Sequence, residues 1–317
     1  MSTTLPNAES EPLAPDTPPS QRLRREYFAC RLHFTWPGTT RALSDQQKSL
    51  AAAQFDACSE SVTAGKRLWD TRHPSYRAVT SLRSEITAYW KAATLPFPEP
   101  GLRLLPQSDL VPFNLRLQEY YSGLREAVDE LALHFEELKA GAQRKLGALF
   151  NPADYPADIR PLIDVSWEFP SVEVPEYLLR LSPEVYVEQS QRIAQRFDEA
   201  VELAETAFRD ELSRLVSHLA ERLSSNEDGQ PRVFRDSAIE NLREFFQRFR
   251  SLSLSSNQEL DSLVGECERV LGGVQPQSLR DSEALRREVA TQLSVVQSQL
   301  DQLVTVRPRR SIQRPRG

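Results

Sequence analysis

The chain has 317 residues, of which 39% are hydrophobic and 26% are charged. This composition can bury a core, and the length suggests one large or two modest domains. The net charge of −6 is modest, so it gives no general case for binding nucleic acid or adsorbing to a membrane. No stretch approaches the roughly 18 consecutive apolar residues that a transmembrane helix needs. We therefore do not expect a protein with membrane-spanning helices.

The N-terminal segment and the cysteines indicate the compartment. Residues 1–22 are polar and rich in proline, and they contain no apolar segment typical of a secretory signal peptide. They cannot bury enough apolar surface to offset the loss of chain entropy, so we expect a disordered tail. Three cysteines are too few for a disulfide framework or a cysteine-based zinc site. The sequence therefore predicts a protein of the reducing cytoplasm.

Three short segments have the pattern of β-strands. In residues 27–36, Cys30, Leu32, Phe34 and Trp36 alternate with polar side chains, which is typical of a half-buried strand. Residues 101–106 and 163–169 are similar. Because an isolated strand is not stable, we expect these three strands to pair into one small sheet.

The first helices are marked by caps and prolines. Ser44 or Asp45 can cap a helix that reaches about Asp70, and a second helix is expected from about Pro74 to Ala93. Prolines at positions 96, 98 and 100 prevent this second helix from continuing.

The strongest pattern lies between residues 113 and 149. Apolar residues alternate there in steps of four and three, as in the a and d positions of a coiled coil, and Asn151-Pro152 ends the pattern. The apolar positions of this segment are Leu117, Tyr121, Leu124, Val128, Leu131, Phe135, Leu138 and Ala142. One long helix is predicted.

A second long apolar stripe is expected on a helix over residues 183–223, followed by a break at 224–231 and three C-terminal helices. Each long stripe would expose a row of large apolar groups, so each needs a partner. The simplest arrangement packs the two long helices against each other as an antiparallel hairpin, because the linker keeps them close. Homodimerisation through the same stripes is the alternative, so the oligomeric state stays open.

The predicted fold is therefore mainly α, with a long, coiled-coil-like antiparallel helical hairpin, further helices and a small sheet of three short strands. The expected organisation is a disordered tail at 1–22, a main domain at 23–225 that holds the sheet and the hairpin, a C-terminal helical segment at 226–306 that packs on it, and a flexible basic tail at 307–317.

The sequence contains no recognisable motif for a P-loop, a dinucleotide fold, a nucleophile elbow, a zinc protease or an EF-hand. Glu130, His134 and Glu137 share one helix face, but a metal site in a bundle needs ligands from a facing helix. The second long helix offers only His218, so a solvated face is the favoured interpretation. We expect no enzyme activity, no cofactor, and no catalytic or metal-binding residue; an enzyme with a cryptic metal site is an alternative.

Two segments could contact a partner. The first, residues 89–103, combines aromatic residues with alternating prolines that stiffen the backbone. A rigid connector is its favoured interpretation, and a partner-binding edge made by Tyr89, Trp90, Phe97 and Arg103 is the functional one.

The second segment is the C-terminal tail, which is rich in arginine and contains no acidic residue. It could bind phosphate or an acidic protein surface, although it lacks aromatic residues that would stack on bases. Its candidate residues are Arg307, Arg309, Arg310, Arg314 and Arg316.

Three stretches resemble a family. They are KRLWDTRHPSYRAVTSLRSEITAYWKAATLPFPEPGLRLLP (66–106), LFNPADYP (149–156) with VSWEFPSVEVPEYLL (165–179), and VFRDSAIENLREFFQRF (233–249). They resemble an uncharacterised helical family of bacterial and phage- or plasmid-associated proteins that are encoded near a MoxR-type AAA+ ATPase and a von Willebrand factor A-type protein. The resemblance implies an accessory role beside the ATPase and supplies no catalytic residues.

The favoured function is a non-enzymatic scaffold or adaptor that binds protein partners through a long helical platform. The AAA+ ATPase or the von Willebrand factor A-type protein is the partner that the resemblance implies, and no membrane partner is expected. The alternative outside this class is a nucleic-acid-associated structural protein that uses its basic tail.

Overall fold

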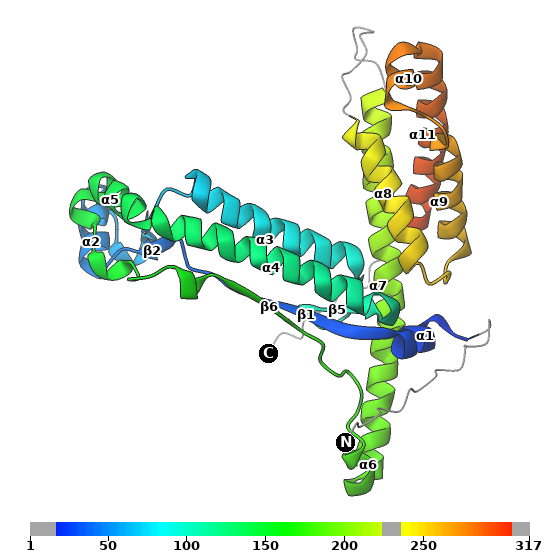
Figure 1. Ribbon diagram of the computed structural model, residues 1–317, viewed down its shortest axis with the longest axis horizontal. Coiled ribbons are helices and arrows are strands. Elements are labelled where there is room, and N and C mark those ends of the chain that lie inside the picture. Colours follow the sequence, from blue (N-terminus) through cyan, green and yellow to red (C-terminus); the bar gives the residue numbers. More distant parts are fainter. Residues whose placement is uncertain (1–16, 224–235, 306–317) are drawn as a thin grey trace, which may run out of the picture. The chain divides into compact units, whose positions relative to one another are not determined.

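The computed structural model describes residues 17–223 and 236–305. The chain is mainly helical and has a four-stranded sheet and a two-stranded sheet, so the mainly α class with a small sheet is confirmed (Figure 1). It divides into two compact units. The described parts of Met1–Ala29, Thr94–Pro106 and Ser171–Gly317 form the bundle unit, and Cys30–Ala93 with Gln107–Pro170 forms the hairpin unit.

This division differs from the predicted domain boundaries. The predicted main domain, 23–225, contains residues of both units, and the predicted boundary at 225/226 falls inside the bundle unit. The physical reason is that the C-terminal helices pack directly on the second long helix and share its core.

The hairpin unit is built on two antiparallel helices, α3 (Pro74–Ala93) and α4 (Leu110–Leu133). At one end, the ring of Tyr89 stacks on Phe113 with centroids 5.5 Å apart. At the other end, the rings of His73 and His134 lie 5.3 Å apart. These contacts show that the start of α3 lies beside the end of α4.

The heptad segment is not one continuous helix. Helix α4 ends at Leu133, and α5 (Phe135–Leu146) begins after His134, whose backbone N–H bonds to the carbonyl of Leu131 at 3.1 Å in a tight turn. The prediction of one helix over 113–149 is therefore wrong at this point. The apolar pattern continues across the turn, because Leu131, Phe135 and Leu138 are all buried.

Short elements complete the hairpin unit. Helix α2 (Asp45–Ala53) begins with the predicted cap, since Ser44 accepts from the backbone of Gln47 in a capping box. It stops far short of Asp70, because the backbone turns at Asp56, where φ is 50°, a left-handed conformation. The 3₁₀ turns of this unit are η1 (Ser59–Ser61), η2 (Gln107–Asp109), η3 (Gly147–Leu149), η4 (Pro152–Asp154) and η5 (Arg160–Leu162).

All three predicted strands are present, as β1 (Tyr27–Thr35), β5 (Leu102–Pro106) and β6 (Asp164–Glu168). The expectation of only three strands is wrong. The longer sheet has the order β4-β5-β1-β6 and includes β4 (Leu95–Pro96), while β2 (Thr40–Ala42) pairs with β3 (Gly65–Arg67). Strands of two or three residues are too short to show a period-two pattern, so the sequence does not reveal them.

The strand pairs have defined registers. In the hairpin unit, β1 and β6 are antiparallel, with Phe34 opposite Val165. In the bundle unit, β4 and β5 are antiparallel, with Leu95 opposite Leu104. Both Leu95 and Leu104 are buried, so this short ribbon contributes to the core of its unit.

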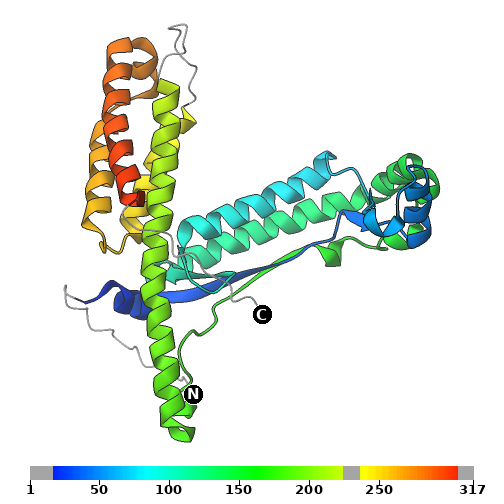
Figure 2. The same ribbon diagram turned by 180° about the vertical axis from the view of Figure 1, so that it is seen from behind.

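The bundle unit is organised by α7 (Pro183–Leu223), which packs along α8 (Ser237–Leu252), α9 (Gln258–Leu271) and α11 (Glu283–Thr305). Figure 2 shows α11 alongside α7. The ring of Phe208 on α7 meets Phe249 of α8 edge-on, with centroids 5.0 Å apart. Helices α1 (Pro19–Glu26), α6 (Tyr177–Leu181) and α10 (Pro276–Asp281) are shorter.

The partner predicted for each long helix is wrong. Within its own unit, α4 packs on α3, and α7 packs on α11, α8 and α9. Both α3 and α11 carry apolar faces of their own; Val79 and Ile86 are buried on α3, and Leu293 is buried on α11. Only residues 94–109 separate α3 from α4, and closing a short loop costs less entropy than closing a long one.

The predicted disordered tail overlaps a helix. Residues 1–16 lie outside the described part of the chain, but α1 begins at Pro19. Leu23 of this helix is fully buried in the core of the bundle unit. This buried side chain anchors α1 to the unit, and the composition of residues 1–22 does not indicate it. The predicted break at 224–231 lies outside the described residues. Among the helices that are described, none is long and apolar enough to cross a membrane.

The pairing of α11 with α7 can be tested by Leu293→Ala. Leu293 is fully buried, so its truncation should lower the free energy of unfolding by about 2–5 kcal/mol. Denaturant unfolding followed by circular dichroism measures this change. Val295→Ala on the same helix is the control, since Val295 is 48% exposed and should cost far less. Equal losses in the two variants would contradict the packing.

A buried ion pair joins two parts of the hairpin unit. Lys66 Nζ on β3 lies 2.6 Å from Asp154 Oδ2 and donates to the carbonyl of Leu149 at 2.6 Å. The two side chains are only 6% and 11% exposed. Lys66 and, more weakly, Arg41 hold the pKa of Asp154 below its ordinary value.

Lys66→Met should lower the free energy of unfolding by up to about 3–5 kcal/mol, because it leaves a largely buried carboxylate with only its weaker partner, Arg41. The pKa of Asp154 is lower in the folded state, so its stabilising contribution is present above about pH 4 and is lost as the pH falls further. Stability should therefore fall less between pH 5 and pH 3 in Asp154→Asn than in the wild type. Urea unfolding followed by tryptophan fluorescence measures both effects, and equal pH slopes would refute the second.

Candidate functional site

The predicted partner-binding residues of the connector make internal contacts. In the hairpin unit, Tyr89 is stacked as described and Trp90 is half-buried. In the bundle unit, Phe97 is 6% exposed and meets Phe197 edge-on at 5.4 Å, while Arg103 donates to the hydroxyl of Thr94 at 2.7 Å. These contacts are those expected of a rigid connector, and a partner-binding role for the four residues stays a prediction.

The residues predicted in the basic tail, Arg307, Arg309, Arg310, Arg314 and Arg316, lie outside the described residues. Their role also stays a prediction.

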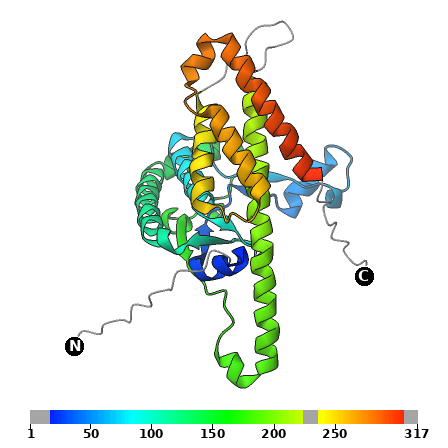
Figure 3. The same cartoon turned by 90° about the vertical axis from the view of Figure 1, so that its right-hand side faces the viewer.

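Five large apolar side chains are exposed on α6 and the first turns of α7, both in the bundle unit. Figure 3 shows that this end of α7 extends beyond the helices α8 to α11 that cover its other end. We call this surface the tip patch; its residues and their exposed fractions are Tyr177 (55%), Leu179 (49%), Leu181 (76%), Val185 (40%) and Val187 (52%).

The tip patch carries a negative rim. Between residues 176 and 188 the only charged groups are the carboxylates of Glu176, Glu184 and Glu188 and the guanidinium of Arg180. Glu188 accepts from Arg192 at 2.6 Å. Large apolar groups that stay exposed together and are edged by charge are typical of a protein interaction site.

The spacing of the apolar residues in the sequence indicates this patch, because it differs from the spacing of a helix face that one neighbour covers. Leu179 and Leu181, and again Val185 and Val187, are spaced by two residues. Residues two apart on a helix point in different directions, so one neighbouring helix cannot bury both.

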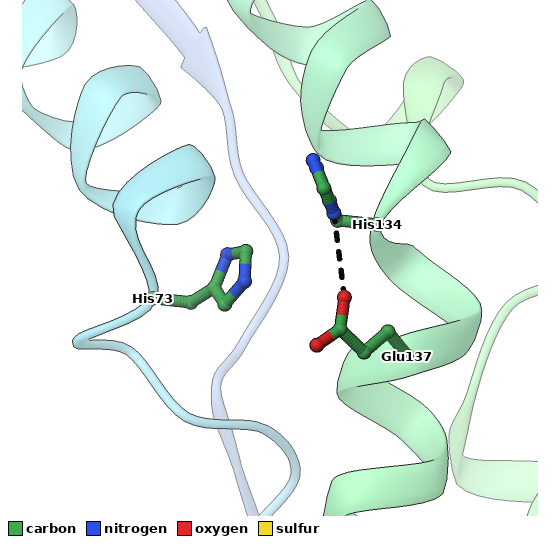
Figure 4. Close-up of side chains that lie close together, drawn as sticks. All are labelled: His73, His134 and Glu137. Carbon is green, nitrogen blue, oxygen red and sulfur yellow. Dashed lines mark hydrogen bonds and ion pairs between the residues drawn. The ribbon is translucent and has the colours of Figure 1, made fainter.

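A second candidate site lies at the end of the hairpin unit where α4 gives way to α5. His73 immediately precedes α3, His134 occupies the turn between α4 and α5, and Glu137 lies in the first turn of α5. Figure 4 shows the two imidazoles and the carboxylate facing a common space from these separate segments. One potential ligand atom from each residue lies within 4.8 Å of the other two.

Hydrogen bonds orient both rings. His73 Nδ1 lies 2.7 Å from the hydroxyl of Ser75, which is a buried residue. His134 Nε2 lies 3.1 Å from Glu130, and its Nδ1 lies 3.4 Å from Glu137 Oε2. Glu137 and then Glu130 raise the pKa of His134 above its ordinary value, because each carboxylate favours the protonated ring.

A cleft of about 550 Å³ opens beside these residues. Its cationic lining consists of Arg67, Arg72, Arg144 and Lys145, against the carboxylates of Asp70 and Glu137. Asp70 is bound by Arg72 at 3.2 Å and by Lys145 at 3.1 Å, and these two cations hold the pKa of Asp70 well below its usual range. The cleft therefore has the size of a small-molecule site and an excess of positive charge.

The sequence identified part of this cluster. It grouped Glu130, His134 and Glu137 on one face, but looked for the missing ligand on the second long helix, where it found His218. His218 belongs to the bundle unit, and the second imidazole comes instead from His73. An antiparallel pairing of residues 74–93 with the heptad segment would have placed His73 beside His134.

The raised pKa of His134 can be measured by NMR titration. We expect its value to lie above 6.5, the ordinary value for histidine, and to fall when Glu137→Gln removes the stronger of its two carboxylate partners. Glu130→Gln should lower it as well. An unchanged value in both variants would show that the carboxylates do not contact the ring in solution.

Comparison with known proteins adds no further identification. The chain matches no protein-family model, no curated protein and no solved structure. Its function is therefore inferred from the two surfaces described above.

Proposed function

We propose that this protein is a non-enzymatic scaffold or adaptor that binds a protein partner through the tip patch. The observation that carries this proposal is the exposure of five large apolar side chains on α6 and the first turns of α7. Burying one such side chain contributes about 1.5–3 kcal/mol, so a partner that covered several of them would gain appreciable binding energy.

The charge of the rim defines the partner further. Three carboxylates and one guanidinium lie in the same chain segment as the apolar side chains, so a complementary surface has apolar anchors flanked by lysine or arginine. An amphipathic helix with a basic edge has this chemistry and a suitable shape. A second copy of this chain would bring the same carboxylates together, which disfavours self-association through the patch.

The rest of the bundle unit holds the helix that carries part of this surface in a fixed position. Helix α7 has 41 residues and is about 60 Å long at 1.5 Å per residue. Its C-terminal half is anchored by buried side chains such as Leu212, Val216 and Leu219. The α7 part of the tip patch is thus carried on a helix that the core holds firmly, and α6, which carries the rest, packs on α7, as a scaffold requires.

The resemblance of the sequence implies that the partner is a MoxR-type AAA+ ATPase or a von Willebrand factor A-type protein. Affinity purification from the native host tests both the adaptor role and this identity. The wild-type chain should recover a stoichiometric partner, and Leu181→Asp with Val187→Asp should lose it, because charge in the patch opposes apolar contact.

Leu133→Asp is the matched control. Leu133 is an apolar residue that is 74% exposed, but it lies in the hairpin unit, so this variant should retain the partner. Circular dichroism checks that all variants fold. Recovery of the wild type without any partner, or retention of the partner by the tip-patch variant, would contradict the proposal.

A further inference from the structure

The cluster of His73, His134 and Glu137 has the donor set of a transition-metal site. Two imidazole nitrogens and one carboxylate bind Zn²⁺ in catalytic sites, where a further position stays open, and the same set binds other divalent first-row metals. The structure brings these donors together from two segments that are distant in sequence. This distinguishes the cluster from a local ion pair on one helix.

The distances suit a metal ion. Bonds of about 2.0–2.1 Å in tetrahedral geometry separate two ligand atoms by about 3.4 Å. His134 Nδ1 and Glu137 Oε2 are 3.4 Å apart. One ring nitrogen of His73 lies within 4.8 Å of a ligand atom of each of the other two residues, and the side chain is partly exposed, so a rotation of the ring can bring this nitrogen to the metal.

The outer contacts of the two rings are also those of metal ligands. A metal-bound histidine usually uses its second ring nitrogen for a hydrogen bond that fixes the ring. Ser75 contacts His73 Nδ1, and Glu130 contacts His134 Nε2. These contacts leave Nε2 of His73 and Nδ1 of His134 on the side of Glu137, where Figure 4 shows ring nitrogens facing the shared space.

The neighbouring cleft indicates what completes the coordination. Three protein ligands leave at least one position open, and the cleft beside Glu137 is lined by Arg144, Lys145, Arg67 and Arg72. These cations favour an anionic group next to the metal. Phosphate has the charge and size for this position, and arginine binds it through paired N–H groups.

We propose that His73, His134 and Glu137 bind one divalent transition-metal ion, and that the cationic cleft binds a phosphate group at its open position. This site is in the hairpin unit and is separate from the tip patch, so neither proposal depends on the other.

Cobalt is the probe for the metal. Untagged full-length protein, stripped with a chelator, should bind one Co²⁺ per chain with the visible absorption of a nitrogen- and oxygen-ligated ion, and Zn²⁺ should displace it. His73→Gln, His134→Gln and Glu137→Gln should each weaken binding at least about 100-fold. Glu130→Gln, which changes only an outer contact, should weaken it about 10–100-fold.

His33→Gln is the matched control. His33 also contacts a carboxylate, Glu168, at 3.1 Å. Among the described residues, however, it does not belong to a group of three side chains that could hold a metal ion. This variant should bind Co²⁺ as the wild type does. No binding by the wild type, or equal binding by the His73→Gln, His134→Gln and wild-type proteins, would overturn the metal site. Circular dichroism confirms folding, and if one variant unfolds the other two decide.

Inorganic phosphate tests the second half of the proposal. Added to the Co²⁺-loaded wild type, it should change the visible spectrum in a saturable way, and Arg144→Gln with Lys145→Gln should weaken this response at least about 10-fold. Absence of a spectral change, or an equal response in this variant, would overturn the phosphate site and leave the metal result to stand by itself.

Discussion

The structure depends on the burial of long apolar helix faces against the nearest helix that carries a matching face. Helices α4 and α7 each expose a continuous stripe when considered alone, and water opposes that exposure strongly. Each stripe is covered within its own unit: α3 covers α4, while α8, α9 and α11 cover the C-terminal part of α7. The chain divides into two units because each of the two long helices packs on a different set of helices.

Both candidate sites occur where this burial stops. The tip patch lies on α6 and on the turns of α7 that extend past α8 to α11, and its apolar side chains are exposed there (Figure 3). The His73 cluster lies where α4 ends, at a turn that a continuous coiled coil would not contain.

Much of the local structure could be predicted from the sequence. The bounds Pro74–Ala93 and Pro183–Leu223 agree with the prolines and the apolar periodicity, and the three longer strands follow from alternation. Periodicity shows which face of a helix is buried but not which helix covers it, and this is why the hairpin partner was wrong. For the same reason the sequence did not reveal one of the three residues of the metal-type cluster, since recognising His73 requires knowing that α3 lies beside α4.

The path of the chain has a consequence for synthesis on the ribosome. The hairpin unit is complete once Pro170 has been made, whereas the bundle unit combines the N-terminal helix α1 and Thr94–Pro106 with the segments from Ser171 onward. The hairpin unit can therefore fold while residues 171–317, nearly half of the chain, are still being translated. Leu23 of α1, which belongs to the other core, must wait as an exposed leucine until α7 and its neighbours emerge. Protection of this early segment by a chaperone would then matter most for this protein during the time in which residues 171–305 are made.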